Sequence, residues 1–183
     1  PTVSAGTSGG TFNTTQSVAL TASAGASIFF TTNSSTPDNT STPYTGPITI
    51  STDTVLSFIA IGSTGLSSRV RRQTYLIDTL APANHALASA TAVISADNQA
   101  SFALSIENAE LGTNYSIVIQ DSAASPSEIV RTGRIVNASS TSIQVDLSTF
   151  ANGQVSATLV LTDAAGNSSP AFFLALTKTG SLG

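Results

Sequence analysis

The feature that most constrains this chain is an alternation of apolar and polar residues with a period of two. Apolar side chains recur at every second position in short runs, for example in 17–21, 143–147 and 155–161. Residues two apart lie on the same face of a β-strand, so each run predicts a strand with one buried face. Clusters of Gly, Pro, Asn and Ser separate the runs, as expected for turns between strands.

One stretch, the Ala-rich segment 83–96, would tolerate a helix. Its Ser, Thr and Val residues favour an irregular first strand instead. With closely spaced strands and no helical segments between them, the chain is expected to be all-β and to form antiparallel β-sandwiches.

The segment 77–82 separates two sets of predicted strands. Pro82 has no backbone N–H and disfavours a helix at Ala81, so the connection should be short and extended. Segments 61–68 and 162–169 both resemble a Gly- and Ser-rich turn before a last strand. We therefore expect two sandwiches in series, over residues 1–78 and 79–183.

The composition excludes several classes of protein. The 183 residues include six Lys and Arg, ten Asp and Glu and no Cys, so the net charge is −4. This charge leaves no basic surface for nucleic acid, and the missing Cys excludes disulfides and thiolate zinc sites. No apolar run approaches the about 20 residues of a membrane span. Instead of charge the chain carries hydroxyl groups, on 29 Ser and 27 Thr.

Catalysis is not predicted. The single His, His85, is the only candidate base for a Ser/His/Asp arrangement, and its position next to the linker favours a solvated or half-packed side chain. Glu107 and Glu110 are close in sequence, but they fall in a predicted loop of a small sandwich rather than in a cleft. The chain is therefore predicted not to be an enzyme.

Five strings in the first half carry a resemblance to a known family. They are Gly-Thr-Phe at 10–12, Ser-Val-Ala-Leu-Thr at 17–21, Ala-Ser-Ile-Phe-Phe-Thr-Thr at 26–32, Ser-Thr-Pro at 35–37 and Tyr-Thr-Gly-Pro-Ile at 44–48. With them, residues 9–70 resemble the small β-sandwich at the C-terminal end of chitobiase and β-hexosaminidase enzymes. The resemblance implies a non-catalytic domain, because those enzymes perform catalysis in a different domain.

Two strings in the second half carry another resemblance. Asp-Thr-Leu-Ala-Pro at 78–82 and Leu-Thr-Asp-Ala-Ala-Gly-Asn at 161–167 make residues 78–177 similar to a bacterial immunoglobulin-like domain of tandem-repeat surface adhesins. Together the resemblances imply two immunoglobulin-like sandwiches in tandem. The implied function is a structural extender segment of a large secreted or surface-bound bacterial adhesin. Such a segment is expected to be an extracellular monomer whose partners are the neighbouring domains of its own chain and a glycan or another surface ligand.

An alternative function is an accessory carbohydrate-binding module of a secreted glycan-degrading enzyme, with a glycan as ligand. Sugar rings stack on exposed aromatic side chains. Tyr44 and Tyr115 are the candidates, since most Phe residues fall within the apolar stripes of strands. Tyr44 belongs to the string of the family resemblance, which favours a structural role for it.

Calcium is the one cofactor that the sequence suggests. In a seven-stranded sandwich, the loops 107–114, 137–142 and 163–167 would lie at the end where the chain enters the second domain. Oxygen ligands from Asp78, Glu107, Glu110, Asp163 and Asn167 would then converge, and the adhesin resemblance implies calcium at such junctions. The alternative is that Asp163 and Asn167 only cap a hairpin turn in which Gly166 adopts positive φ.

Overall fold

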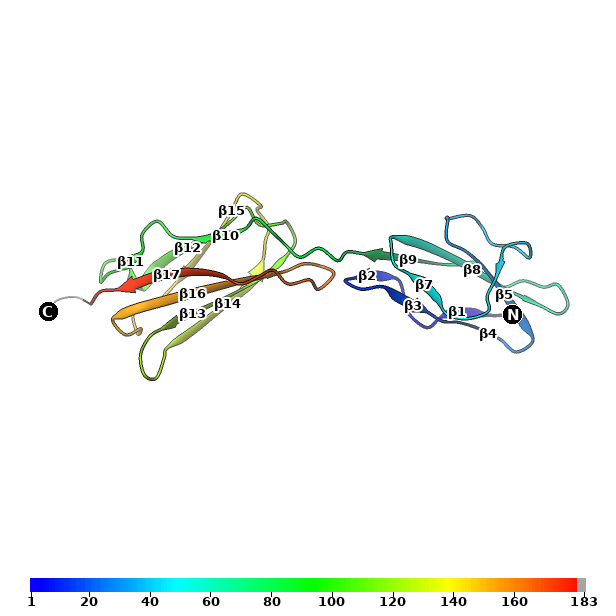
Figure 1. Cartoon of the computed structure of the whole chain (residues 1–183), viewed down its shortest axis with the longest axis horizontal. Coiled ribbons are helices and arrows are strands. Elements are labelled where there is room, and N and C mark those ends of the chain that lie inside the picture. The colour runs from blue at the N-terminus through cyan, green and yellow to red at the C-terminus, as the bar shows by residue number, and fades with distance from the viewer. Residues whose placement is uncertain (181–183) are drawn as a thin grey trace. The chain divides into compact units, whose positions relative to one another are not determined.

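The computed structural model describes residues 1–180 and divides the chain into two compact units (Figure 1). The first unit is Pro1–Thr79 and the second begins at Leu80, against an expected boundary between residues 78 and 79. Nearly all regular structure is β-strand, and the described residues include one short 3-10 turn, η1 (Gln99–Ser101). No helix among residues 1–180 has the length and apolarity needed to cross a membrane.

The first unit is a β-sandwich. One layer is a five-stranded sheet in the order β2-β9-β8-β5-β6, and the opposite layer consists of the two-stranded sheets β1-β4 and β3-β7. The strands are β1 (Val3–Ala5), β2 (Gly10–Phe12), β3 (Gln16–Val18), β4 (Leu20–Ala22), β5 (Ala26–Thr31), β6 (Thr42–Pro43), β7 (Ile48–Ile50), β8 (Thr54–Gly62) and β9 (Arg71–Ile77).

The core of the first unit forms where these layers face each other. Val18 and Leu20 from β3 and β4 are buried, as the alternation predicts, and Phe58 and Tyr75 are buried from β8 and β9. The Tyr75 hydroxyl donates to the carbonyl oxygen of Thr7 (2.6 Å), which satisfies the one polar group of this side chain. The expected core residues of this unit are all buried or packed against the core: Val18, Leu20, Ile28, Phe30, Ile48 and Ile50.

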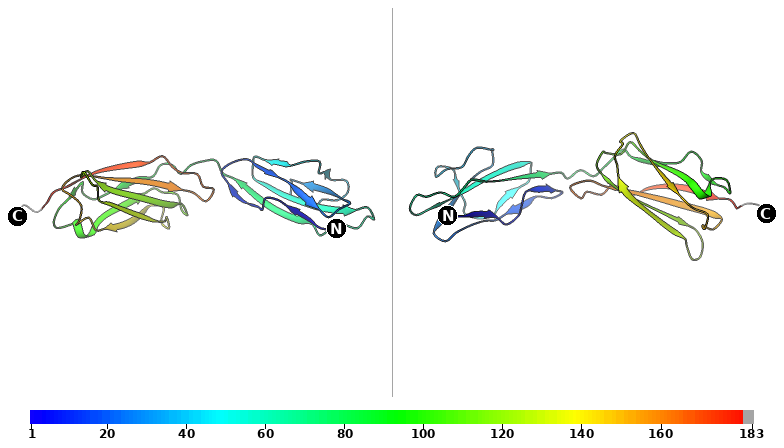
Figure 2. Two further views of the ribbon diagram at one scale, coloured as in Figure 1. Left: turned by 90° about the horizontal axis from the view of Figure 1, so that it is seen from below. Right: turned by 180° about the vertical axis from the view of Figure 1, so that it is seen from behind.

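The second unit is also a β-sandwich, with a three-stranded sheet in the order β10-β12-β15 and a five-stranded sheet in the order β11-β17-β16-β13-β14. Figure 2 shows both layers from two further directions. The strands are β10 (Ala86–Ala88), β11 (Val93–Ile94), β12 (Phe102–Glu107), β13 (Asn114–Asp121), β14 (Glu128–Arg134), β15 (Ser140–Val145), β16 (Gly153–Thr162) and β17 (Phe172–Lys178).

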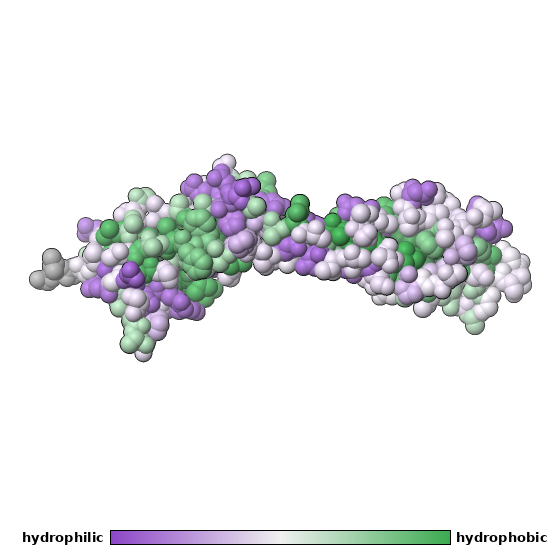
Figure 3. All heavy atoms as spheres, in the orientation of Figure 1, coloured by the Kyte–Doolittle hydropathy of each residue, from purple (hydrophilic) through white to green (hydrophobic). Residues whose placement is uncertain are grey.

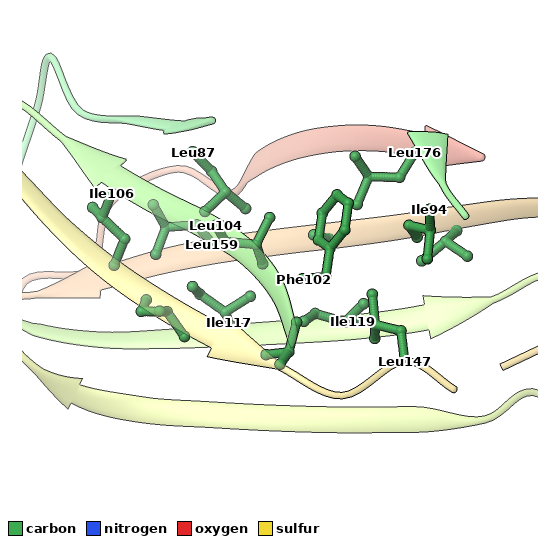
Figure 4. Close-up of a cluster of buried hydrophobic side chains, with 14 of the residues drawn as sticks. Leu87, Ile94, Phe102, Leu104, Ile106, Ile117, Ile119, Leu147, Leu159 and Leu176 are labelled. Atoms are coloured by element: carbon green, nitrogen blue, oxygen red, sulfur yellow. The ribbon is translucent and has the colours of Figure 1, made fainter. Parts of the chain in front are cut away.

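The core of the second unit lies between these two sheets (Figure 4). Phe102, Leu104 and Ile106 point inward from β12, and Ile117 and Ile119 point inward from β13. The expected core of this unit is confirmed in full: Phe102, Leu104, Ile117, Ile119, Val145, Leu159 and Leu161 are all buried. Period-two burial of β-branched and Leu side chains therefore determines which face of each strand packs inward.

The expected antiparallel architecture is confirmed, with two short parallel additions. β2 pairs in parallel with β9 in the first unit, and β11 pairs in parallel with β17 in the second. The segment 83–96 forms the two short strands β10 and β11, in agreement with an irregular first strand. In each unit the first stretch of chain contributes to both layers. β1 and β2 lie in different layers of the first unit, and β10 and β11 lie in different sheets of the second.

Candidate functional site

The candidate metal site of the second unit falls at the end of this sandwich where the chain enters it, here called the proximal end. Ala86 at the start of β10 lies opposite Glu107 at the end of β12. Asn114 at the start of β13 lies opposite both Thr162 and Arg134. The loops 107–114, 134–140 and 162–172 are therefore at the proximal end, as the topological argument from the sequence required.

Asp163 and Asn167 form a closed turn at the end of β16. The backbone N–H of Asn167 donates to Oδ1 of Asp163 (2.9 Å), and Nδ2 of Asn167 donates to Oδ2 (2.8 Å). The backbone N–H of Asp163 donates to the carbonyl oxygen of Asn167 (3.1 Å), and Gly166 has a φ of 93°. An Asp side chain that accepts from its own turn is a typical way to stabilise such a turn.

The carboxylate of Asp163 is buried, yet it stays ionised more readily than an ordinary Asp. Burial alone would raise its pKa, but hydrogen bonds from Asn167 and from the amides of Gly166 and Ala165 lower the pKa below its usual value. This arrangement supports the interpretation in which Asp163 caps a turn. It also leaves an anionic group at the proximal end.

The two glutamates occupy different environments. Glu107 is half-buried at the end of β12, where its Oε1 accepts from the Ser105 hydroxyl (2.9 Å). Glu110 is exposed in the following loop. It lines an open hollow of about 350 Å³ together with Asn84, Asn108 and Ser139. Residues from three segments of the second unit thus surround this hollow.

Asp78 belongs to the first unit, where its backbone N–H donates to the carbonyl oxygen of Phe12 (2.9 Å). Within residues 1–180, no three His, Asp or Glu side chains group closely enough to hold a metal ion. A calcium site at Asp78, Glu107, Glu110, Asp163 and Asn167 therefore stays a prediction.

The two tyrosines proposed for sugar stacking have structural contacts. The Tyr44 hydroxyl accepts from the backbone N–H of Leu20 (3.0 Å), and its ring packs against the first core. Tyr115 packs against the second core, and its ring lies close against Gly133, where a Cβ atom would collide with it. Both rings are therefore used in holding their own sandwiches together.

His85 is half-buried just before β10, and neither ring nitrogen has a hydrogen-bond partner among the described residues. Burial lowers the pKa of His85, because the charged imidazolium would lose its hydration without gaining a partner. A His held neutral in this way fits the half-packed position expected from the sequence.

Two buried charged residues of the second unit were missed at the sequence level. Lys178 is 5% exposed, and its Nζ donates to the carbonyl oxygens of Leu147 (2.7 Å), Ser148 (2.8 Å) and Phe150 (2.8 Å). The signal was present, because Lys178 continues the inward alternation of Phe172, Leu174 and Leu176. This lysine holds the loop between β15 and β16.

Asp121 anchors the same loop from the end of β13. Its Oδ2 accepts from the backbone N–H of Ala151 (2.8 Å), while Oδ1 accepts from the amides of Ala123 (3.2 Å) and Ser127 (3.1 Å). These bonds, led by the one from Ala151, lower the pKa of Asp121. Asp121 and Lys178 are therefore structural anchors at the end of the unit opposite to the proximal end.

Comparison with known protein families gives one match. Residues 7–72 match the model of the chitobiase/beta-hexosaminidase C-terminal domain. The first unit is therefore similar to this family over residues 7–72. The match covers most of that unit, including the residues that carried the resemblance in the sequence. No curated protein sequence matches the chain.

Among solved structures, the fibronectin(III)-like modules of CbhA from Clostridium thermocellum align over 98% of this chain and 95% of theirs, with a TM-score of 0.51 and 12% identity. This likeness shows the fold of the chain: two immunoglobulin-like or fibronectin(III)-like sandwiches. A tetra-tandem repeat in the extending region of a large adhesion protein aligns over 95% of this chain and 48% of its own, with a TM-score of 0.43 and 19% identity.

Proposed function

We propose that this chain is a non-catalytic structural segment of a secreted or surface-bound bacterial protein, in which it spaces other domains. The observation that carries the proposal is that each unit closes a hydrophobic core of its own. A sandwich with a closed core needs no partner to fold, so its mechanical role is to hold its two chain ends apart.

The short connection between the units supports this role. The backbone of Asp78 is hydrogen-bonded within the first unit, and Pro82 is buried. Three residues, Thr79, Leu80 and Ala81, lie between these two positions. A connection of three residues followed by a proline has few conformations to lose, so it restricts bending more than a longer Gly/Ser linker would.

The spacer role is tested by the distribution of distances between the units. The chain has no cysteine, so spin labels can be attached at Ala24→Cys and Ser125→Cys, both at exposed positions. Double electron–electron resonance should give a narrow distribution. Insertion of Gly-Ser-Gly-Ser after Leu80 should broaden it. Equal widths for both proteins would contradict the spacer role.

Calcium at the proximal end of the second unit would add to this stiffness and remains part of the proposal. A cation stabilises the folded form that binds it by mass action. Calcium should therefore raise the melting temperature of the second unit relative to EDTA, and Asp163→Ala should abolish the difference. Superimposable melting curves in calcium and EDTA would show that Asp163 only caps its turn.

The alternative role, an accessory carbohydrate-binding module, is supported by the family of the first unit and by the fold likeness to the CbhA modules. The sequence that flanks this segment separates the two roles. Further sandwiches of the same kind would favour the spacer, and an adjoining catalytic domain would favour the accessory module.

A further inference from the structure

The outer face of the five-stranded sheet in the second unit carries an exposed aromatic side chain. Along β17, Phe172, Leu174 and Leu176 face the core, while Phe173, Ala175 and Thr177 face outward. Phe173 is 71% exposed, and the other large hydrophobic side chains exposed among the described residues are aliphatic. The Phe173 ring therefore does not contribute to the hydrophobic core.

Phe173 does not stand alone on this face. It lies opposite Thr158 on β16, Thr158 lies opposite Val118 on β13, and Val118 lies opposite Val130 on β14. Val130 is also exposed. The four side chains form one row across four strands. Figure 3 shows hydrophobic surface, in green, over the part of this unit where β16 and β17 run.

A groove lies directly beside this row, with a volume of about 340 Å³. The next row of the sheet contains Gln120, Ser156 and Ala175, which lie opposite one another on β13, β16 and β17. Ser156 and Ala175 are short side chains between the longer Phe173 and Gln120, which explains why the surface is hollowed here. Gln154 and Thr177, also opposite each other, line its far side.

The groove offers neutral hydrogen-bonding groups. Gln120, Gln154, Ser156 and Thr177 present amide and hydroxyl groups and are all exposed. Its outward charged neighbour is Glu128, whose carboxylate already accepts a hydrogen bond from the Gln120 amide. Asp121 also lines the groove, but its carboxylate already accepts hydrogen bonds from the amides of Ala151, Ala123 and Ser127. No basic side chain is among the lining residues, so a phosphate or a carboxylate would lose hydration here without compensation.

We propose that this face binds a neutral polysaccharide, with one sugar ring stacked on Phe173 and the adjoining ring in the groove. Pyranose rings have apolar faces and hydroxyl groups at their edges, which matches an aromatic surface beside amides and hydroxyls. The groove volume lies within the range of small-ligand sites. The site is independent of the spacer role, which would stand if no sugar bound.

The test is native gel electrophoresis of the full chain through gels that contain hydroxyethylcellulose, xyloglucan or galactomannan, with polygalacturonate as the charged polymer. At least one neutral polymer should retard the protein, and polygalacturonate should not. Phe173→Ala should weaken the retardation at least tenfold. Ser156→Gln should do the same by filling the groove while Phe173 is kept.

The matched control is Val136→Ala, which removes another highly exposed apolar side chain at the proximal end. This variant should be retarded like the unchanged protein. The proposal is overturned if no neutral polymer retards the protein, or if Phe173→Ala and Val136→Ala behave alike. It is also overturned if sedimentation shows a dimer that Phe173→Ala dissociates, because a second copy would then cover the face.

Discussion

The turns that precede the last strand of each unit have the same backbone hydrogen bonds but different side chains. In the first unit, Gly62 N–H donates to the Leu66 carbonyl and Gly65 N–H to the Gly62 carbonyl. In the second unit the same two bonds join Asp163 to Asn167 and Gly166 to Asp163. The turn therefore forms without any acidic side chain, and the Asp163–Asn167 pair is an addition to it.

The residues that the turns share explain their common shape. Gly65 and Gly166 both have positive φ, 81° and 93°. Through Oγ, Ser68 and Ser169 each accept from a strand amide, at 3.0 Å in both units, and each donates to the carbonyl oxygen of the next residue, Arg69 or Pro170. A Gly that permits the left-handed conformation and a Ser that closes the strand end are enough to define the turn.

The last strands differ more than the turns before them. Tyr75 of β9 is buried and makes one hydrogen bond to a loop carbonyl, whereas Lys178 of β17 makes three. A buried ammonium group that loses an acceptor costs free energy, and a buried carbonyl oxygen that loses its donor does so too. The second unit should therefore be the more sensitive of the two to loss of its anchor.

The largest expected effect tests that difference. Lys178→Met keeps most of the side-chain volume but removes a donor from three carbonyl oxygens, of which that of Leu147 keeps the Phe150 N–H, and should cost the second unit about 3 kcal/mol. Native-state hydrogen exchange of the full chain measures the free energy of unfolding of each unit separately. Thr177→Met, at the exposed neighbouring position, is the control. A loss as small as that of the control would show that the loop holds without the lysine.

Removal of the shared serine should destabilise both units, but unequally. Ser169 is 6% exposed and Ser68 is only half-buried, so the groups that Ser169→Ala leaves without partners are further from water. We expect a loss of about 2 kcal/mol for Ser169→Ala and about 1 kcal/mol for Ser68→Ala. Urea unfolding followed by amide signals of each unit gives both values. Equal losses would mean that burial does not distinguish the two turns.

The shared glycines should respond alike. Ala at a positive φ is strained, and a Cβ on Gly65 would meet no neighbouring atom, so strain is the whole effect there. Gly65→Ala and Gly166→Ala should each cost about 1 kcal/mol in their own unit. Gly46→Ala, where a Cβ also meets open space and φ is not positive, is the control. A loss at only one of the two turns would contradict their common conformation.

The smallest effect is expected from exchange of the side chains that differ. Asp163→Gly with Asn167→Leu places the residues of the first unit at the two positions of the acid–amide pair, and should cost less than about 1 kcal/mol at pH 7. The pKa of Asp163 is lowered in the folded state, so its stabilisation is complete above the unfolded value of about 3.9 and is lost as the pH falls through the folded value.

Urea unfolding at pH 7 and at steps between pH 4 and pH 2 measures this dependence. The gap between the unchanged protein and the double variant should close toward low pH. A gap that stays constant would show that the ionised carboxylate does not contribute to the stability of the turn.

The fold was predictable because burial in a sandwich follows a period of two. Val18 and Leu20, or Leu159 and Leu161, share a face in the sequence and share a core in the structure. The echo between segments 61–68 and 162–169 likewise corresponded to one kind of turn. Such local patterns need no knowledge of which strands pair.

The polar contacts were harder to predict from the sequence, because they join residues far apart along the chain. Lys178 meets carbonyl groups some thirty positions earlier, and Asp121 reaches Ala151 across the same distance. The alternation marked both residues as inward-facing, but it did not indicate their partners. The alternation also did not draw attention to the exposed Phe173, because the neighbouring Phe172 met the expectation of a buried aromatic residue in this strand.

The burial of Lys178 has a consequence for how neighbouring sandwiches of one polypeptide avoid exchanging strands. Units with the same turn before the last strand risk inserting that strand into the wrong neighbour while both are still incomplete. If β17 entered a sandwich that lacked the carbonyls of Leu147, Ser148 and Phe150, it would bury an ammonium group without acceptors. The misassembled product would be strongly disfavoured, so this lysine also encodes which strand completes which sandwich.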